Sequence, residues 1–244
     1  MTGPVLVEDR GDRVMVRLNR PEVRNAIDAA MVAALHDVCV ELEQSPRVAL
    51  LIGQGGTFAA GADIAQLRER RRDDALRGIN SGLFDRVARL PMPVIALLDG
   101  HALGGGAELA YACDFRIGTP GTRIGNPEPG LGILAAAGAS WRLKELIGEP
   151  LAKEVLLAGR VLDAEAAHAV HLLNEVVEPE ELEAAGHRLA DRITAQAPLA
   201  IRLTKRVFHA PHEAHPFLDD VAQAVLFETD EKHERMTRFL ERRR

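Results

Sequence analysis

The strongest constraint on the fold is a pattern that occurs twice: a buried strand, a loop of small residues and then a helical segment. The first copy is VALLIG at 48–53, followed by QGGTFAAGADIAQL, and the second is PVIALLDG at 93–100, followed by HALGGGAELAYACD. A continuous apolar run of this length is typical of a strand covered on both faces. The repeated order of strand, loop and helix predicts an α/β fold.

The segments around these two copies extend the prediction. Two β-patterned runs at 5–7 and 14–18 flank the turn-rich EDRGDR, which predicts a hairpin. Asp28 is a candidate N-cap for a long amphipathic helix, which ends near Ser45 and Pro46. FRIG at 115–118 and TRIG at 122–125 predict a short strand pair.

After this pair the chain is mainly helical, and LLNEVV at 172–177 is the one strand candidate there. No linker rich in proline, glycine or serine divides the sequence. We therefore predict a core over residues 1–190 and a helical C-terminal region over residues 191–244.

Composition excludes several classes of function. With 244 residues, 47% of them hydrophobic, the chain can bury a large core. Its formal charge of -6 disfavours nucleic acid as a main partner. Cys39, Cys113 and nine scattered histidines lack metal-type spacing, so we expect inert core thiols and no metal site. No signal peptide or membrane span is evident, which predicts a cytoplasmic protein.

The glycine stretch HALGGGAEL at 101–109 is a candidate functional segment. A dinucleotide fingerprint would need glycine at Leu109, a P-loop would need GK[ST], and a nucleophile elbow would need serine or cysteine between glycines. What remains is a turn that exposes backbone N–H groups at a helix N-terminus, where a developing anion is stabilised. Because an oxyanion needs at least two donors, we predict that Ala60 and Gly105 each supply one.

Two glutamates are candidates for acid–base chemistry beside this turn. Glu108 lies three residues past Gly105, and Glu128 is held between prolines in GNPEPG. Each has a simpler explanation. Glu108 would only complement the helix dipole, and Glu128 would only be an exposed acid in a turn.

Six segments, in this order along nearly the whole chain, make it resemble the enoyl-CoA hydratase/isomerase, or crotonase, superfamily. These segments are LNRPEVRNAI (18–27), GGTFAAGADI (55–64), PVIALLDGHALGGGAELAYACDFRIG (93–118), GNPEPGLG (125–132), WRL (141–143) and APLAIRLTKRVF (197–208). The resemblance implies a spiral of ββα units with a helical C-terminus that drives trimers, commonly paired into hexamers.

The resemblance also implies roles for single residues. The N–H groups of Ala60 and Gly105 would bind the thioester carbonyl of an acyl-CoA, with no metal or redox cofactor. Glu108 and Glu128 match the two catalytic glutamates of the hydratases, which hold a water between them. One carboxylate takes a proton from this water, and a proton reaches C2 chiefly from Glu128.

Further matches concern the binding of CoA. Ala62, Asp63 and Ile64, after Gly61, match the loop that cradles the adenine. Arg24 and Ala26 match the segment along the CoA phosphates and pantetheine. An exposed arginine at a helix entry is the simpler explanation for Arg24.

One segment departs from the hydratase pattern. After GNPEPGLG the pattern continues with a Pro-Gly and a Gly-Gly pair, whereas this chain has ILAAAGAS, with Ala135 and Ala136 in place of Pro-Gly. The resemblance gives position 136 the backbone N–H that binds the catalytic water. Alanine keeps that N–H but disfavours left-handed backbone angles.

The leading hypothesis is therefore a 2-enoyl-CoA hydratase. A double-bond isomerase of the same family is the nearest rival, but it needs only Glu128 and usually lacks an acid at position 108. Other acyl-CoA lyases of the family use residue sets that we do not match here. From a different class, the altered ILAAAGAS segment suggests a noncatalytic acyl-CoA-binding subunit.

Overall fold

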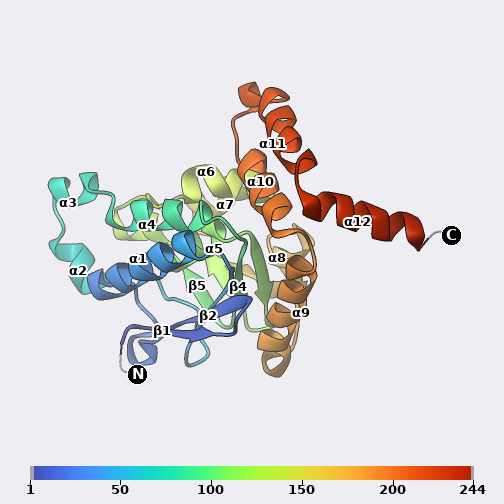
Figure 1. Cartoon of the computed structure of the whole chain (residues 1–244). Coiled ribbons are helices and arrows are strands. Elements are labelled where there is room, and N and C mark those ends of the chain that lie inside the picture. Colours follow the sequence, from blue (N-terminus) through green and yellow to red (C-terminus); the bar gives the residue numbers. More distant parts are fainter. Residues whose placement is uncertain (1–2, 243–244) are drawn as a thin grey trace. The chain divides into compact units, whose positions relative to one another are not determined.

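The computed structural model describes residues 3–242, and its internal contacts divide the chain into two compact units, Met1–Ala190 and Asp191–Arg244. The first unit holds all the strands of the described chain, in two sheets (Figure 1). The larger sheet has the order β1-β2-β3-β4-β6-β9, and the smaller has the order β5-β7-β8. The strands are β1 (Val5–Asp9), β2 (Arg13–Leu18), β3 (Val48–Gly53), β4 (Val94–Leu98), β5 (His101–Leu103), β6 (Phe115–Gly118), β7 (Arg123–Gly125), β8 (Leu162–Asp163) and β9 (Glu175–Val176).

Helices complete each unit. The first unit contains α1 (Ala29–Gln44), α2 (Ile64–Glu69), α3 (Arg72–Leu76), α4 (Ile79–Ala88), α5 (Gly105–Ala112), α6 (Ala139–Ile147), α7 (Glu149–Ala158), α8 (Ala164–Ala169) and the 3-10 turns η1 (Pro21–Val23), η2 (Glu128–Leu131) and η3 (Pro179–Glu181). Helix α9 (Leu182–Thr194) begins in the first unit and ends in the second. The second unit contains α10 (Pro198–Phe208), η4 (His212–Ala214), α11 (Phe217–Phe227) and α12 (Asp230–Glu241).

The N-terminal predictions are confirmed. Strands β1 and β2 form the antiparallel hairpin, and β2 then pairs in parallel with β3, which pairs in parallel with β4. Asp28 caps α1, because its Oδ1 accepts a hydrogen bond from the Met31 N–H at 2.8 Å. Cys39 and Cys113 are buried thiols, as expected.

The predicted pairing of FRIG with TRIG is wrong. FRIG forms β6, which lies between β4 and β9 in the larger sheet, whereas TRIG contributes β7 to the smaller sheet, between β5 and β8. The two strands are separated because Thr122 is buried and its hydroxyl donates to the Leu98 carbonyl at 2.8 Å. This bond ties the turn to the end of β4 and directs β7 away from β6.

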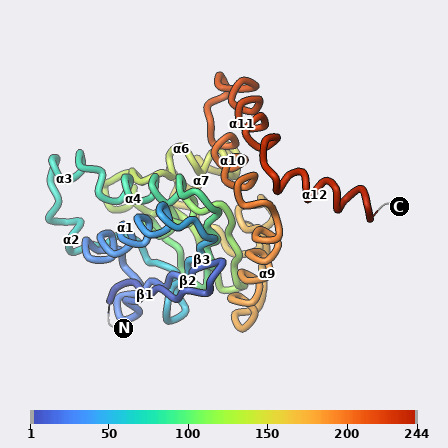
Figure 2. Tube along the Cα trace, in the orientation of Figure 1, coloured from blue at the N-terminus to red at the C-terminus, as the bar shows by residue number. Residues whose placement is uncertain are grey.

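The central strands are buried on both faces. Val14, Val16 and Leu18 of β2 join the main core cluster, together with apolar side chains of α1 and α4, which run side by side (Figures 1 and 2). The opposite face carries Leu50 and Leu97, and α9 packs so closely there that a Cβ on Gly186 would lie 2.8 Å from both leucines. Burial on both faces explains why VALLIG and PVIALLDG contain no alternating polar residues.

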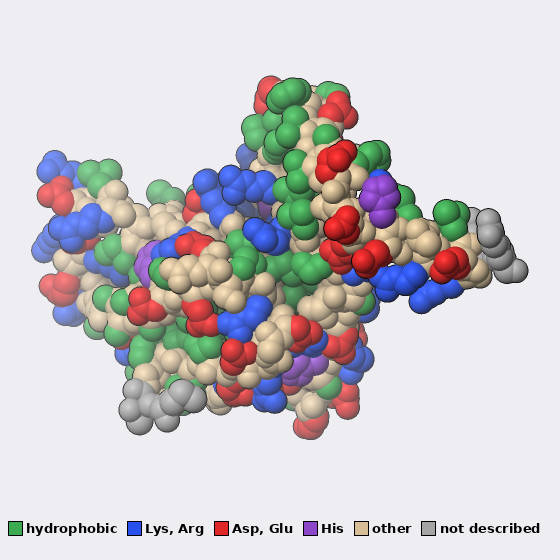
Figure 3. Space-filling view, viewed as in Figure 1, with side chains coloured by type: hydrophobic (Ala, Val, Ile, Leu, Met, Phe, Trp, Pro, Cys, Tyr) green, Lys and Arg blue, Asp and Glu red, His purple; other side chains and the backbone are tan. Residues whose placement is uncertain are grey.

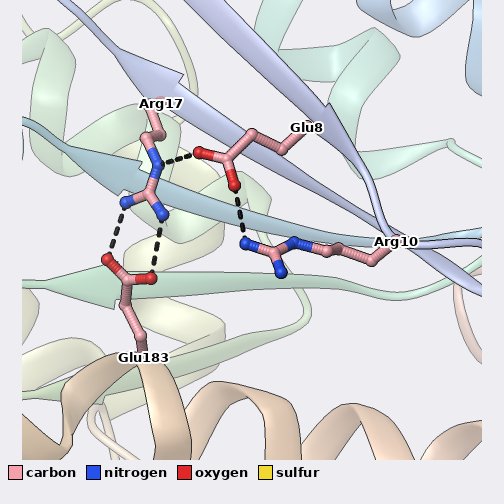
Figure 4. Close-up of polar contacts among 4 residues, drawn as sticks. All are labelled: Glu8, Arg10, Arg17 and Glu183. Carbon is pink, nitrogen blue, oxygen red and sulfur yellow. Dashed lines mark hydrogen bonds and ion pairs between the residues drawn. The ribbon is translucent and has the colours of Figure 1, made fainter.

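A polar network joins the hairpin to α9 within the first unit (Figure 4). The Arg17 guanidinium donates to both carboxylate oxygens of Glu183, at 2.6 and 2.9 Å, and through Nε to Glu8 at 2.7 Å. Glu8 also accepts from Arg10 at 2.8 Å. These bonds lower the pKa of both carboxyl groups.

Backbone hydrogen bonds between the segments that follow the strands, at their carboxyl ends, position the site. The loop after β3 meets the segment after β4, where the Ala59 N–H donates to His101 and the Leu103 N–H donates back to Ala59, both at 3.0 Å. The Gly104 N–H then donates to Gly125 at 2.9 Å, which brings the segment after β7 to the same place. In open α/β sheets, ligands bind outside the carboxyl ends of the strands.

Candidate active site

Each of the three glycines at the start of α5 meets a different structural requirement. Gly104 has a φ of +53°, a backbone conformation that side chains disfavour. A Cβ on Gly106 would lie 2.2 Å from the carbonyl oxygen of Ala59, so only glycine allows the loop after β3 to approach this closely. Gly105 is the first helical residue, so its N–H lies among those that the helix cannot bond internally.

The structure corrects the prediction for Ala60. The Ala60 N–H donates to the carbonyl oxygen of Arg24 at 2.9 Å, so it is already engaged and not free to bind an oxyanion. Two residues further on, the Ala62 N–H has no hydrogen-bond partner within residues 3–242. A Cβ on Gly105 would lie 3.5 Å from the Ala62 nitrogen. Ala62 and Gly105 therefore each present a backbone N–H beside the pocket that bonds to no group of residues 3–242.

Glu108 lies in the first turn of α5 and is buried, with 3% of its surface exposed. Its Oε1 accepts two backbone hydrogen bonds, from Ala137 at 2.7 Å and from Ala139 at 3.1 Å. Burial raises the pKa of Glu108 to about 7, although these two bonds act against the rise; the nearby charge of Glu128 adds to it. A carboxyl group with this pKa can exchange a proton near neutral pH.

Glu128 begins η2 and is also buried, with 8% of its surface exposed. Its Oε1 has a long contact with Asn126 Nδ2 at 3.4 Å, and its Oε2 has no partner in the described part of the chain. Burial raises the pKa of this carboxyl group as well. Burial thus raises the pKa of both carboxyl groups, and Glu108 differs from Glu128 in accepting two backbone N–H bonds that stabilise its ionised form.

Gly104 and Asn126 fix the position of Glu128. A Cβ on residue 104 would lie 3.1 Å from Glu128 Oε1, so the carboxyl group rests against a bare backbone. Asn126 is fully buried; its Oδ1 accepts from the Tyr111 hydroxyl at 3.1 Å, and its Nδ2 lies 3.4 Å from the Gly104 carbonyl. This contact chain joins α5 to η2 behind the carboxyl group.

A pocket of about 150 Å³ accessible to water connects these groups. Both glutamates and the free N–H groups of Ala62 and Gly105 line it. The lining residues are Ala60, Gly61, Ala62, Ile64, Leu67, Arg70, Asn80, Gly104, Gly105, Glu108, Pro127, Glu128, Leu131, Ile133, Leu134, Ala136 and Ala137. The wall is thus mostly apolar with a few converging polar groups, which is the usual character of a small-molecule site.

The remaining predicted binding residues fall into two groups. Gly61, Ile64 and Ala136 line the pocket, whereas Arg24, Ala26 and Asp63 do not. Asp63 instead caps α2, because its Oδ1 accepts from the Gln66 N–H at 3.2 Å. The predicted adenine loop Ala62–Ile64 is therefore only partly in this pocket.

The altered segment after η2 is compatible with the site. Ala136 does not have a positive φ, so alanine causes no left-handed strain there. Its neighbour Ala137 supplies one of the two N–H groups that bind Glu108. Gly138, which has a φ of +137°, leaves room for Arg142, because a Cβ there would lie 2.3 Å from Arg142 Nη1.

Sequence reasoning missed several residues of the site. Asn126 supports Glu128, and the Ala139 N–H supports Glu108, whereas Arg70 and Asn80 line the pocket itself. For Asn126 the only signal was an amide side chain two residues before a candidate acid. For Arg70 the only signal was the basic run RERRRDDALR, which predicts a solvated helix face.

Among residues 3–242, no three histidine, cysteine, aspartate or glutamate side chains cluster in a way that could hold a metal ion. Within the same residues, no helix combines the length and the apolar character needed to cross a membrane.

Comparison with known proteins assigns the family. The model of the enoyl-CoA hydratase/isomerase family matches residues 12–244. The chain belongs to the enoyl-CoA hydratase/isomerase family. Its two sheets and helical C-terminus are the fold of that family: the crystal structure of an enoyl-CoA hydratase from Bacillus anthracis superposes with a TM-score of 0.92, at 30% identity, over 98% of this chain and 96% of that one.

Two curated members of the enoyl-CoA hydratase/isomerase family are similar over nearly the full length. A short-chain-enoyl-CoA hydratase of Clostridium acetobutylicum is 34% identical over 98% of this chain and 95% of its own. A crotonyl-CoA hydratase of Syntrophomonas wolfei is also 34% identical, over 98% of this chain and 96% of its own.

Proposed function

We propose that this family member is a 2-enoyl-CoA hydratase, which adds water reversibly across the C2–C3 double bond of a short trans-2-enoyl-CoA. One observation carries the proposal: two buried carboxyl groups, Glu108 and Glu128, line the same pocket beside two free backbone N–H groups. The similarity to a short-chain and a crotonyl-CoA hydratase supports it.

In this proposal the thioester oxygen accepts hydrogen bonds from the N–H groups of Ala62 and Gly105. As oxygen adds to C3, negative charge develops on the thioester oxygen and an enolate forms. The N-terminus of α5 stabilises that charge, because its free N–H groups carry partial positive charge. Removing one such donor typically costs about 2.7–4 kcal/mol of transition-state stabilisation.

The two carboxyl groups handle the protons. The ionised Glu108 takes a proton from the attacking water, and the protonated Glu128 gives its proton to C2, so water adds to one face of the double bond. The proton then passes from Glu108 to Glu128 before the next turnover. The hydrogen bonds of Ala137 and Ala139 to Glu108 support its role as the base.

Double-bond isomerisation is the second enzymatic candidate. It would need only Glu128 to move a proton, and the buried Glu108 would then have no role. A buried carboxyl group without a role is costly, so its presence favours hydration. The relaxed backbone at Ala136 removes the main reason to expect a noncatalytic acyl-CoA-binding subunit.

The mechanism uses only side chains, backbone groups and water, so no metal or redox cofactor takes part. The apolar face of α11, formed by Phe217, Val221 and Val225, suits assembly into a trimer or hexamer. A cytoplasmic location and the absence of a nucleic-acid partner stay predictions from the sequence.

The test follows the enoyl-thioester absorbance of crotonyl-CoA and of a longer 2-enoyl-CoA. We expect turnover by the wild type and a loss of about 10³-fold or more in the Glu128→Gln variant. Glu145→Gln changes an exposed glutamate outside the pocket and serves as the matched control. Binding of both esters without turnover would instead support the noncatalytic alternative, and equal turnover by Glu128→Gln would exclude the proposed role of Glu128.

A further inference from the structure

A pair of polar side chains lines the pocket beyond the two glutamates. Arg70 follows α2 and Asn80 lies in the first turn of α4, and both are half-buried. Arg70 Nη1 donates to Asn80 Oδ1 in a long contact of 3.4 Å. The hydratase mechanism above uses neither of them.

Arg70 and Arg71 form no ion pair in the described residues, unlike the other arginines of this basic run, and of these two only Arg70 lines the pocket. Neighbouring arginines form ion pairs with acids of the same run: Arg68 with Glu69, Arg72 with Asp73 and Arg77 with Asp74. Arg70 has no ion-pair partner in the described residues, and it is the only cationic side chain of that part of the chain that lines the pocket. An unneutralised guanidinium in a cavity is a binding group for an anion.

Asn80 places this cation close to the thioester. A Cβ on Gly105 would lie 3.6 Å from Asn80 Nδ2 and 3.5 Å from the Ala62 nitrogen, so the amide lies near the two proposed oxyanion donors. The Asn80 Oδ1 faces Arg70 on the other side. One side chain therefore separates the guanidinium from the thioester end of the pocket.

This short separation decides which part of a substrate Arg70 meets. The phosphates of CoA lie beyond the whole pantetheine arm from the thioester, too far away to share a cavity of about 150 Å³ with it. A group at the end of a short acyl chain lies within a few bonds of C3. Because the ionised Glu108 makes the potential of the pocket negative, an acidic acyl chain needs a cation there.

We propose that Arg70, held by Asn80, makes the pocket selective for short 2-enoyl-CoA esters whose acyl chain ends in a carboxylate. This inference rests on the proposed hydratase function for its kinetic readout. The guanidinium binds the terminal carboxylate through charge-assisted hydrogen bonds.

The test compares crotonyl-CoA with its 4-carboxy analogue. In the wild type, we expect kcat/KM for the carboxylated ester to exceed that for crotonyl-CoA by about tenfold or more. The ratio of the two values should fall by about tenfold in Arg70→Met and further in Arg70→Glu, which repels the anion. Arg71→Met removes the adjacent arginine, which does not line the pocket, and should leave the ratio unchanged.

A binding measurement separates this inference from the hydratase proposal. Saturated esters cannot be hydrated, so calorimetry with butyryl-CoA and its 4-carboxy analogue reports pocket preference alone. If the wild type hydrates neither enoyl ester but binds the carboxylated saturated ester more tightly, with the preference lost in Arg70→Glu, the hydratase proposal fails and the selectivity stands. A wild type that prefers the uncharged esters, or an Arg70→Glu variant with an unchanged preference, would overturn the role of Arg70.

Discussion

The glycines of HALGGGAEL show how single residues build this site. The sequence shows that backbone must approach something closely there, but it does not say what each glycine meets. In the structure, Gly104 gives the positive φ and the bare surface behind Glu128, and Gly106 admits the Ala59 carbonyl. Gly105 presents the N–H of the helix start. These roles depend on contacts between distant segments, which a local pattern cannot specify.

Substitution of Gly104 tests this division of roles. Gly104→Ala adds a methyl group at a φ of +53° and 3.1 Å from Glu128 Oε1, so the carboxyl group must move. We expect a loss of about 1–3 kcal/mol in unfolding free energy and a fall of about 10²-fold in hydration kcat. Urea titration and the absorbance assay measure the two effects.

Gly130→Ala is the matched control for this variant. Gly130 also lies near Glu128, in η2, but nothing lies within 4 Å of a Cβ there and its φ is not positive. It should behave like the wild type in both assays. Equal effects of the two substitutions would show that Gly104 has no special relation to Glu128.

Glu108 links the chemistry of the site to stability. Its pKa is raised in the folded chain to about 7, above the value of about 4.3 in an unfolded chain. The folded state therefore holds the proton more tightly, so stability falls as pH rises from about 4.3 and the full cost is present above about 7. Glu108→Gln removes this cost while keeping an oxygen for the Ala137 N–H. We expect the variant to be more stable than the wild type by roughly 1–3 kcal/mol at pH 8, and by little at pH 4.

Urea titrations at the two pH values measure this difference, and hydration assays complete the test. In Glu108→Gln, turnover should fall by about 10²–10⁴-fold, because the base is gone. In the wild type, activity should decline as pH falls below about 7, where Glu108 becomes protonated. A variant that is less stable than the wild type at pH 8 would contradict the cost assigned to burial of this carboxyl group.

Several site residues could be predicted from the sequence, and others could not. Glu108, Glu128 and Gly105 were found because their motifs are local, and they do line one pocket. The choice of Ala60 was wrong because its N–H bonds to Arg24, a residue 36 positions earlier, and a linear motif does not show this pairing. Arg70 was hidden by a basic run in which most arginines pair with neighbouring acids.

Among the elements, the positions of the long strands were predicted better than the pairing between strands. Apolar patterning located β2, β3 and β4, because buried parallel strands carry long apolar runs. The three-residue β5 was missed, and β6 and β7 were paired wrongly, since short strands carry too little pattern to define a neighbour. The smaller sheet, which brings Gly104 next to Gly125, is made entirely of such short strands.

The network around Arg17 predicts how the hairpin and α9 depend on each other. Arg17→Met breaks the paired bonds to Glu183 and the bond to Glu8. We expect a loss of about 1 kcal/mol in unfolding free energy at pH 7, because Arg17 is largely shielded while its partners are partly exposed. Both partners have lowered pKa values, so this stabilisation is present above about pH 4.3 and is lost as pH falls through their folded values.

Urea titrations at pH 7 and pH 3 check this prediction, with Arg10→Met as the control. Arg10 makes a single bond to Glu8 from an exposed position, so its loss should cost little at either pH. The difference between wild type and Arg17→Met should shrink at pH 3. A difference of the same size at both pH values would mean that packing of the Arg17 stem, rather than its charge, holds the hairpin.

The chain as a whole carries an apolar surface that one copy leaves uncovered. Within the second unit, hydrophobic side chains gather over α11 (Figure 3). Phe217, Val221 and Val225 recur every four residues on this helix and are 75%, 44% and 50% exposed. Soluble monomers seldom leave such a continuous apolar face in water, so a second copy of the chain is its expected partner.

Disruption of this face tests the expected assembly. We expect the wild type to have the mass of a trimer or hexamer in light scattering after size-exclusion chromatography. Val221→Asp places a charge in the centre of the apolar face, and burial of an unpaired carboxylate would cost several kcal/mol, so the assembly should dissociate. Gln223→Asp introduces the same charge on the opposite side of α11 and should leave the mass unchanged. A wild-type monomer, or a Val221→Asp variant that stays assembled, would show that α11 is not the contact between copies.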